Sequence, residues 1–409
     1  MITEDAILGT ILKHGYLIKD IDIKPEHLEQ PENKILLKTL INLDKQNKSI
    51  DLVNILGSAP PQSFGGAARL QQLQNLSNAE KIDEYVDTVM DSWREREKLN
   101  ILHLASVDKW SIEKIKSELD RLTNDKTTDR ASISDLLMEV YEAPFKKQTK
   151  QKGVPTGTEI TDKITGGWQD GDLIILAARP SMGKTDVMLH FSRHSGWSGY
   201  IPIVFSLEMS SEKLRNRLIA ATGRIQKGKF KNLEQFLSND EKKNWANIIG
   251  KVDETNIEIF DRAGQTLAEM RVKIRKVLSD YPDKKPMIFV DYLTLMKTED
   301  GNRNMHQQVG ELSKGLKAIA KEFECPVMSL AQLSRNVEQR NDKRPLLSDL
   351  RESGSIEEDA DVVLFLYRDS YYSRDKTDTA LEMIFAKNRE GEVGLVELNY
   401  DPSTGLVYD

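Results

Sequence analysis

A run of residues near the middle of the chain carries the groups that bind the phosphates of a nucleotide. The run is Ala178, Arg179, Pro180, Ser181, Met182, Gly183, Lys184 and Thr185, and it lies between an apolar segment and a helical sequence. A strand, a tight loop and a helix in this order form a P-loop, in which backbone N–H groups surround the phosphates. Lys184 then reaches the β- and γ-phosphates, and the Thr185 hydroxyl binds Mg²⁺. Ala178 replaces the motif's first glycine, and a chance Gly-Lys-Thr is the alternative. The flanking elements favour a site for ATP or another nucleoside triphosphate.

Two acidic residues follow apolar segments and could serve phosphoryl transfer. Asp291 ends the segment Met287–Asp291, four apolar residues and then an acid, which is typical of the carboxylate that orients the metal ion. No glutamate stands beside Asp291, so the group that activates water must come from another segment. Glu208, which ends the run Phe205–Glu208, is the candidate for it. The alternatives are an acid that caps a turn for Asp291 and an acid that starts a helix for Glu208.

These residues lie where apolar, β-branched runs alternate with helical stretches. Buried strands separated by helices predict an α/β fold over residues 154–409, with a mainly parallel sheet and helices on both faces. The last two runs, joined by residues 388–394, predict a hairpin at the edge of this sheet. The predicted strands are Leu173–Ala177, Ile201–Leu207, Ile257–Phe260, Met287–Asp291, Val327–Leu330, Val362–Tyr367, Leu381–Ala386 and Leu395–Asn399.

The earlier part of the chain has a different pattern. Residues 1–125 place apolar side chains at helical spacing and predict an all-helical N-terminal domain. Residues 126–153 predict a linker with a short docking helix near Ile133–Val140, because an isolated helix of this length is marginal unless its apolar face packs on something. The predicted boundaries are therefore 1–125, 126–153 and 154–409.

Composition excludes several classes of protein. The chain has 409 residues, 39% of them hydrophobic, which suffices for two or three domains with cores. No run approaches the roughly 20 apolar residues of a membrane span, and the first residues include acids where a signal peptide has Lys or Arg. The single cysteine, Cys325, excludes an intramolecular disulfide. We expect a soluble, cytoplasmic protein with no membrane partner. Its net charge of −7 still permits a local basic channel for nucleic acid.

Six segments stand in a consistent order along residues 154–409: GWQDGDLIILAARPSMGKT, FSLEMS, VDYLTLM, SLAQLSR, LSDLRESGSIEEDADVVLFLYR and AKNREG. They resemble the ordered motifs of DnaB-type replicative helicases of bacteria and phages. The resemblance implies a RecA-like P-loop core behind a helical collar. It also implies a homohexameric ring that moves 5′ to 3′ on single-stranded DNA and unwinds the replication fork, with a primase and a helicase loader as partners. The helical part of this chain resembles the collar by architecture alone.

The resemblance also implies roles for individual residues. Glu208 would orient the attacking water, and Gln332 in SLAQLSR is similar to the amide that senses the γ-phosphate. Arg389 in AKNREG resembles an arginine finger that reaches the neighbouring subunit's nucleotide, with Lys387 beside it. A guanidinium suits the spread charge of the transition state. Without the resemblance, a surface amide and a solvated hairpin arginine would be the simpler interpretations.

The candidate DNA-binding segment is Asp349–Ser355, which resembles the loop that lines the ring's central channel. Within it, Arg351, Glu352 and Gly354 are the candidate contacts, and a glycine lets phosphates approach backbone N–H groups. A basic stretch upstream adds Arg335, Arg340, Lys343 and Arg344, with few aromatic residues between them. This composition favours contacts to the DNA backbone over base stacking. An ordinary exposed polar loop is the alternative.

Three other functions compete with a helicase. A RecA-like recombination or repair ATPase would bind single-stranded DNA as filaments, whereas the helical collar and the linker helix supply contacts that favour a ring. A small-molecule P-loop kinase would need an acceptor pocket and a lid, and no segment suggests them. A non-catalytic loader or scaffold is disfavoured because Glu208, Asp291, Gln332 and Arg389 form a complete catalytic set.

Overall fold

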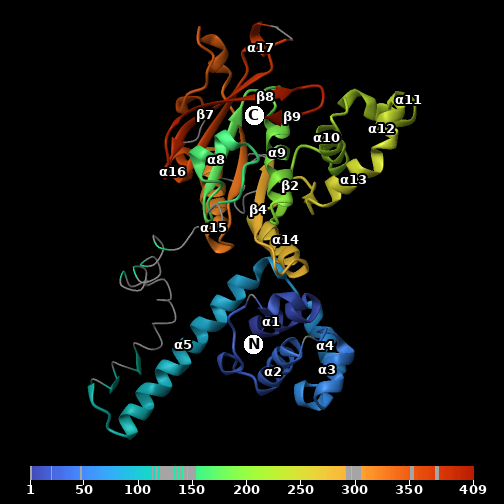
Figure 1. The fold of residues 1–409 in the computed structure, drawn as a ribbon. Helices are drawn as coiled ribbons and strands as arrows, with labels where there is room; N and C mark the ends of the chain where they lie inside the picture. The colour runs from blue at the N-terminus through green and yellow to red at the C-terminus, as the bar shows by residue number, and fades with distance from the viewer. Residues whose placement is uncertain are drawn as a thin grey trace. The chain divides into compact units, whose positions relative to one another are not determined.

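The computed structural model describes residues 2–19, 21–46, 48–112, 153–291, 305–350, 354–373 and 377–409, and residues 114, 115, 118, 119, 133, 137, 141, 145 and 296. The chain forms two compact units, Met1–Thr149 and Lys150–Asp409, each with its own core (Figure 1). Most of the predicted linker helix lies outside the described residues, as do Arg351 and Glu352.

The first unit is helical, as predicted. Glu4 lies buried in it, and its carboxylate accepts the backbone N–H of Glu29 at 2.6 Å just before the second helix. Gly9 is required where α1 meets α4, because a Cβ at this position would lie 1.8 Å from the carbonyl oxygen of Leu73. The helices are α1 (Ile2–Lys13), α2 (Pro31–Lys45), α3 (Leu52–Ser58), α4 (Ala67–Asn75) and α5 (Ile82–Val107), with short 3-10 turns η1 (Gly15–Lys19), η2 (Pro25–His27), η3 (Pro61–Phe64) and η4 (Ala79–Lys81).

The second unit is built on one nine-stranded sheet in the order β3-β2-β4-β5-β1-β6-β7-β8-β9. The pairs from β3 to β6 are parallel, and those from β6 to β9 are antiparallel. The predicted mainly parallel sheet and its hairpin edge are therefore confirmed, and a short last strand, β9, extends them. The strands are β1 (Leu173–Ala178), β2 (Ile201–Ser206), β3 (Glu258–Phe260), β4 (Pro286–Asp291), β5 (Val327–Gln332), β6 (Val362–Tyr367), β7 (Ala380–Asn388), β8 (Gly394–Asp401) and β9 (Leu406–Tyr408).

Helices cover both faces of this sheet. Alternate residues of β1 point to opposite sides: Leu173, Ile175 and Ala177 join the core under α14 and α15, and Ile174, Leu176 and Ala178 join the core under α9 and α10. All six residues of β1 are buried, which explains its unbroken apolar sequence. The helices are α8 (Glu159–Thr165), α9 (Lys184–Trp197), α10 (Ser211–Gly223), α11 (Leu233–Phe236), α12 (Asn239–Lys243), α13 (Trp245–Asp253), α14 (Leu267–Asp280), α15 (Met305–Glu322), α16 (Gly354–Asp359) and α17 (Asp369–Ser373), with 3-10 turns η6 (Lys227–Lys231), η8 (Arg335–Gln339) and η9 (Leu347–Asp349).

The sheet presents two edges along its strand ends. At one edge β1, β2, β4 and β5 end, and each carries a candidate site residue at its last position or in the segment that follows. At the other edge β1 and β6 begin and the antiparallel β7 ends, because Val362 pairs with Asn388. We call these the carboxyl edge and the amino edge after the ends of the parallel strands. The six residues of β1 separate them by about 20 Å.

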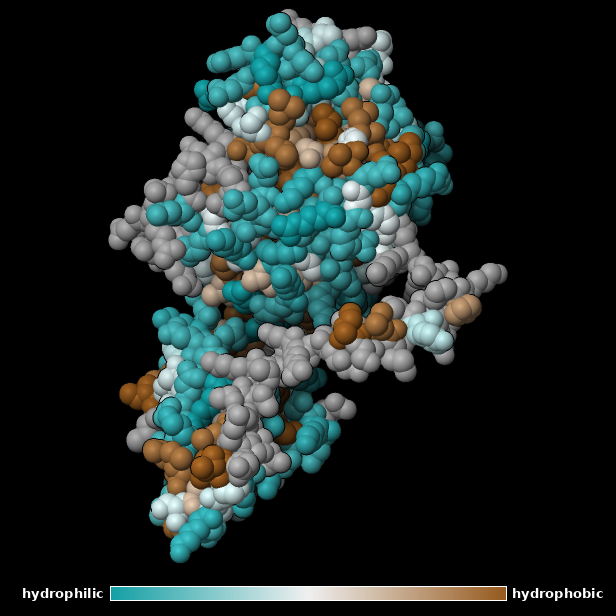
Figure 2. All heavy atoms as spheres, turned by 90° about the vertical axis from the view of Figure 1, so that its left-hand side faces the viewer, coloured by the Kyte–Doolittle hydropathy of each residue, from teal (hydrophilic) through white to brown (hydrophobic). Residues whose placement is uncertain are grey.

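The surface is mostly hydrophilic, with hydrophobic areas on both units (Figure 2). In the second unit, Ile160 of α8 and Leu395 of β8 are among the large apolar side chains that are exposed, and Val393 beside β8 is 63% exposed. Among the residues that the structure describes, no helix is both long enough and apolar enough to span a bilayer.

Candidate active site

The phosphate loop connects the end of β1 to the start of α9. Gly183, with φ of 100°, stands immediately before the first residue of α9, and a Cβ there would lie 3.0 Å from Cζ of Tyr400. Ser181 adopts φ of 68° although it is not a glycine, which costs on the order of 1 kcal/mol. Such strain is typical of functional loops. The loop thus brings the amino end of a 14-residue helix, with its partial positive charge, to the carboxyl edge of the sheet.

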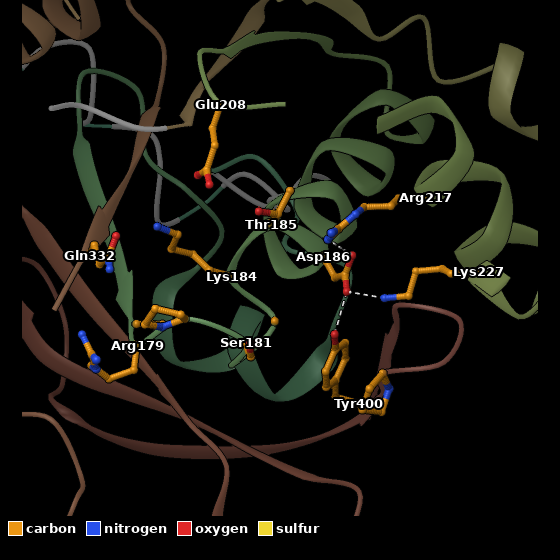
Figure 3. Close-up of a pocket in the computed structure, with 14 residues that line it drawn as sticks. Arg179, Ser181, Lys184, Thr185, Asp186, Glu208, Arg217, Lys227, Gln332 and Tyr400 are labelled. Carbon is orange, nitrogen blue, oxygen red and sulfur yellow. Dashed lines mark hydrogen bonds and ion pairs between the residues drawn. The ribbon is translucent and has the colours of Figure 1, made fainter. Parts of the chain in front are cut away.

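A cavity of about 430 Å³ opens beside this loop. It contains every predicted P-loop residue except Met182, which is 1% exposed and packs in the core beneath the loop. Glu208 and Gln332 complete its predicted part (Figure 3). The lining residues are Ala178, Arg179, Pro180, Ser181, Gly183, Lys184, Thr185, Asp186, Glu208, Arg217, Lys227, Gln332, Tyr400 and Pro402.

Asp291 contacts the cavity-lining residue Thr185 through a pair of oxygen atoms. Asp291 ends β4 and is 1% exposed, and its Oδ2 accepts a hydrogen bond from Thr185 Oγ1 at 3.2 Å. Its Oδ1 is also buried and has no hydrogen-bond partner among the described residues. Burial raises the pKa of Asp291, and the nearby Glu208 carboxylate raises it further, against the effect of Lys184. A buried carboxylate oxygen that lacks a donor, next to a hydroxyl, fits a Mg²⁺ ion, which prefers oxygen ligands.

Lys184 supplies the cation of the site. Its Nζ donates to the carbonyl oxygen of Ala331 at 3.3 Å, directly before Gln332. Burial lowers the pKa of Lys184, while the carboxylates of Asp291 and Glu208 act in the opposite direction. A half-buried ammonium next to two acids is well placed to meet phosphate oxygens.

Glu208 and Gln332 reach the cavity from two other strands. Glu208 follows β2 and is exposed, and its carboxylate points toward Lys184 and Thr185 (Figure 3). Gln332 is the last residue of β5 and pairs in register with Ala178, the last residue of β1. The parallel sheet therefore brings both polar side chains beside the P-loop because all these strands end at the same edge.

A charged cluster that the sequence analysis did not name lies at the other end of the cavity. Asp186, in the first turn of α9, pairs with Arg217 Nη1 and with Lys227 Nζ, both at 2.9 Å, and accepts the Tyr400 hydroxyl at 2.6 Å. Burial by itself would raise the pKa of Asp186, but Arg217, Lys227 and Tyr400 together hold it below its ordinary value. Arg368 also stacks on the Tyr400 ring at 4.9 Å. Asp186 could have been identified from the sequence because it follows Thr185 directly. The other members of the cluster come from elements far away in the sequence, and no local pattern marks them.

Arg179 also contacts residues outside the phosphate loop. Its guanidinium donates from Nη1 to the Leu333 carbonyl oxygen and from Nε to Glu338 Oε1, both at 2.9 Å. The Arg179 side chain therefore ties the phosphate loop to the segment that follows Gln332.

The candidate DNA-binding residues that the structure describes lie on different elements. Arg335 is exposed at the start of η8. Arg344 makes a bidentate pair with Glu382 of β7, at 2.7 and 2.6 Å, and this pair raises the pKa of Arg344. Gly354 is the first residue of α16. The structure therefore places Arg344 in an ion pair within the chain.

Arg389 and Lys387 lie at the amino edge, away from the cavity of their own chain. Arg389 follows β7, and its half-exposed side chain donates from Nη1 to Asp361 Oδ1 at 3.0 Å and from Nη2 to the Glu358 carbonyl oxygen at 2.7 Å. Lys387 Nζ donates to the carbonyl oxygen of Glu357. Neither side chain lines the cavity, so the structure separates these two residues from the other candidate catalytic groups.

Comparison with protein families covers both units. A family model described as the DnaB-like helicase C terminal domain matches residues 153–407. A second model, the DnaB-like helicase N terminal domain, matches residues 2–91. Together the two matches span most of the chain and fall on its two compact units.

Individual relatives agree with these matches. The replicative DNA helicase DnaB of Geobacillus stearothermophilus is 33% identical over 97% of this chain and 91% of its own length. A probable replicative DNA helicase of Trieres chinensis is 35% identical over 91% of this chain and 86% of its own length.

A solved structure is similar as well. A DnaB-like replicative helicase, described with its interactions with primase, superposes with a TM-score of 0.66 at 32% identity, covering 100% of this chain and 99% of that one. The likeness therefore extends over both units and is not confined to the nucleotide-binding core.

Proposed function

The chain belongs to the family of DnaB-like replicative DNA helicases and, as a member, is an ATP-hydrolysing DNA helicase, for which we propose the following residue roles. The helicase acts as a homohexameric ring on single-stranded DNA, moves 5′ to 3′ and opens the duplex at the replication fork. The match of residues 2–91 to the family's N-terminal domain favours this function over a filament-forming recombination ATPase.

One observation carries the proposal for the chemistry. Lys184, Thr185, Glu208 and Gln332 line one cavity. Asp291 does not line it but accepts a hydrogen bond from the Thr185 hydroxyl. Residues 178–185 bind the phosphates, with Met182 supporting the loop from the core. Thr185 and Asp291 would hold Mg²⁺, which supplies charge neutralisation at the phosphates when bound. Glu208 orients the attacking water, and the Gln332 amide contacts the γ-phosphate without adding charge.

The far end of the cavity is proposed to receive the nucleoside. Arg217 and Lys227 give this end two cations for the single carboxylate of Asp186. The Tyr400 hydroxyl is held by Asp186, which keeps the ring in place beside Gly183. A cavity with phosphate donors at one end and a planar ring and a guanidinium at the other matches the shape of a nucleoside triphosphate.

The ring and the DNA contacts form the second part of the proposal. Arg351, Glu352, Gly354 and Arg335 track the DNA backbone, and the pair between Arg344 and Glu382 holds the basic segment beside the sheet. The exposed apolar side chains of the second unit, among them Leu395, offer area for contacts between subunits. Arg389 and Lys387 serve the nucleotide of the adjacent subunit. A primase and a helicase loader are the expected partners, and the expected compartment is the cytoplasm of a bacterium or of a phage-infected cell.

Unwinding of forked DNA tests the proposal. A fork whose single-stranded tail has a free 5′ end should be opened in the presence of ATP and Mg²⁺, whereas a substrate with only a 3′ tail should not. Lys184→Ala is the control, because it removes the cation that faces the phosphates and should abolish both hydrolysis and unwinding. Unwinding from the 3′ tail alone, or by Lys184→Ala, would contradict the proposal.

A further inference from the structure

The amino edge of the sheet holds Arg389 and Lys387 at fixed points. Arg389 bonds to the Asp361 carboxylate and to the Glu358 carbonyl oxygen, and Lys387 bonds to the Glu357 carbonyl oxygen. Both carbonyl groups belong to the last turn of α16 (Gly354–Asp359). A cation suits this place because the carboxyl end of a helix has unpaired carbonyl groups and a partial negative charge. We call the Asp361 carboxylate and these two carbonyl oxygens the Arg389 anchor.

Asp361 itself is fixed on every side. It is 5% exposed and stands directly before β6. Its Oδ2 accepts the backbone N–H of Leu173 at 2.8 Å and also the ammonium of Lys317, so only Oδ1 serves Arg389. Its backbone N–H donates to the Leu173 carbonyl oxygen at 2.9 Å, and its own carbonyl oxygen accepts the backbone N–H of Arg389 at 3.0 Å. The carboxylate therefore cannot turn without breaking the start of β1 and β6.

The anchor leaves part of the Arg389 guanidinium open. The side chain is 49% exposed although Nη1 and Nη2 each make a bond within the chain. A guanidinium has further N–H donors in the same plane, and these can meet a phosphate on another molecule. The bonds to the anchor thus fix the orientation of the guanidinium, while its remaining N–H donors stay accessible.

We propose that Asp361, together with the carbonyl oxygens that end α16, positions Arg389 to act on the nucleotide of the neighbouring subunit. The inference rests on the proposed role of Arg389 and adds a positioning residue, Asp361, that does not touch the nucleotide. An arginine side chain loses about 2 kcal/mol of rotamer entropy when it is ordered. The anchor orders Arg389 before the neighbour's nucleotide arrives, which favours the transition state because the donors need no rearrangement.

The anchor also connects two parts of the machinery. The last two residues of the proposed DNA-binding segment, Gly354 and Ser355, are the first two of helix α16, whose Ile356 is buried in the core. The same short helix therefore carries the end of the DNA segment on one side and holds Arg389 and Lys387 on the other. A shift of α16 on DNA binding would move the side chains that this subunit offers to its neighbour.

Asp361→Asn tests the positioning role. An amide has one acceptor oxygen and one NH₂ donor group. The oxygen is expected to stay with Leu173 N–H and Lys317, so the NH₂ group turns toward Arg389 and places donor against donor. Hydrolysis by the full-length protein should fall on the order of 10²-fold through this misplacement. Binding of a fluorescent ATP analogue to the variant's own intact cavity should be unchanged.

Mixing identifies which subunit is damaged. In Asp361→Asn the nucleotide cavity is intact but Arg389 is displaced. In Lys184→Ala the cavity cannot support hydrolysis but Arg389 keeps its position. In verified mixed assemblies some interfaces pair the intact cavity of an Asp361→Asn subunit with the correctly positioned Arg389 of a Lys184→Ala subunit, so hydrolysis should partly return. Lys317→Met is the matched control: it removes another partner of Asp361 but leaves the carboxylate facing Arg389, and it should hydrolyse ATP near the wild-type rate.

Three results would overturn the inference. One is Asp361→Asn hydrolysing ATP at the wild-type rate. Another is mixed assemblies with Lys184→Ala that recover for Arg389→Ala but not for Asp361→Asn, since Asp361 would then act only on its own subunit's fold. If mixtures with Arg389→Ala also fail to recover, the role of Arg389 in the adjacent subunit falls as well. Should circular dichroism show Asp361→Asn unfolded, Asp361→Glu keeps the charge but displaces the carboxylate, and an undiminished rate for it would equally reject positioning.

Discussion

The two edges of the sheet each carry a buried aspartate, and the two carboxylates are used differently. Asp291 at the carboxyl edge has one oxygen bonded to Thr185 and one oxygen with no hydrogen-bond partner among the described residues. Asp361 at the amino edge has both oxygens engaged, by Leu173, Lys317 and Arg389. A buried oxygen without a donor is costly unless a ligand completes it, so Asp291 marks a binding position. A satisfied carboxylate supports its neighbours instead, so Asp361 marks a positioning role.

The two edges also differ in the nucleotide on which their residues are proposed to act. The carboxyl edge collects Lys184, Thr185, Glu208 and Gln332 around one cavity of the same chain. The amino edge, about 20 Å away, presents Arg389 outward. The carboxyl edge is therefore proposed to serve the subunit's own nucleotide, and the amino edge to serve the next subunit's nucleotide. The following variants test this division.

Arg389→Ala should have the largest effect. Removing the guanidinium should lower hydrolysis by about 10³–10⁵-fold, as for arginine fingers in other NTPases, while the variant still binds nucleotide because its own cavity is unchanged. Steady-state ATPase rates and titration with a fluorescent ATP analogue measure the two effects. Activity of Arg389→Ala near the wild-type rate would mean that the two edges do not cooperate in catalysis.

Glu208→Gln should have the next largest effect, at the carboxyl edge. The amide keeps the shape of the side chain but cannot accept a proton from water, so hydrolysis should fall about 10²–10⁴-fold with nucleotide affinity retained. Mixing Glu208→Gln with Arg389→Ala should partly restore hydrolysis, because the arginine variant has an intact Glu208. Normal turnover by Glu208→Gln would place the activating group elsewhere.

Asp172→Asn should have the smallest effect, on stability at the amino edge. Burial and repulsion by Asp361 raise the pKa of Asp172 to about 6, from an ordinary value of 3.8. A raised carboxyl pKa means that the folded state holds the proton more tightly, so this contribution to stability is present below pH 3.8 and is lost as the pH rises through 6. The side-chain amide of the variant does not ionise, so the variant avoids this loss of stability. It should be more stable than the wild type by about 1–2 kcal/mol above pH 7, once solvent screening is included.

Thermal unfolding of wild type and Asp172→Asn at pH 5 and pH 8 measures this difference. The gain should be larger at pH 8 than at pH 5. A gain that is equal at both pH values would show that Asp172 does not titrate in this range.

Much of the fold could be predicted from the sequence because the signals are local. The apolar runs of β1, β2, β4 and β6 are continuous since each strand is buried on both faces, and the predicted bounds differ from the observed ones by about one residue. The three-residue strand β9, in which only Val407 is buried, was not predicted. Lys184, Thr185 and Asp291 could be named because each is defined by the strand or helix that it adjoins.

Only the tertiary structure decided which side chains meet across the fold. Tyr400 and Asp186 are 214 residues apart, and Arg344 and Glu382 are 38 apart. No local pattern marks these pairs, because an ion pair depends on which strands become neighbours in the sheet.

The amino edge shows the same limit most clearly. Arg389 reaches Asp361 because β7 runs antiparallel to β6 and ends where β6 begins. The sequence by itself predicted the candidate phosphate loop, the candidate metal-binding carboxylate and the alternation of strands and helices, since backbone geometry and burial are encoded in neighbouring residues. The strand order and its register decided which carboxylate would be left with an open oxygen and which would hold an arginine, because that depends on donors that arrive from elsewhere in the chain.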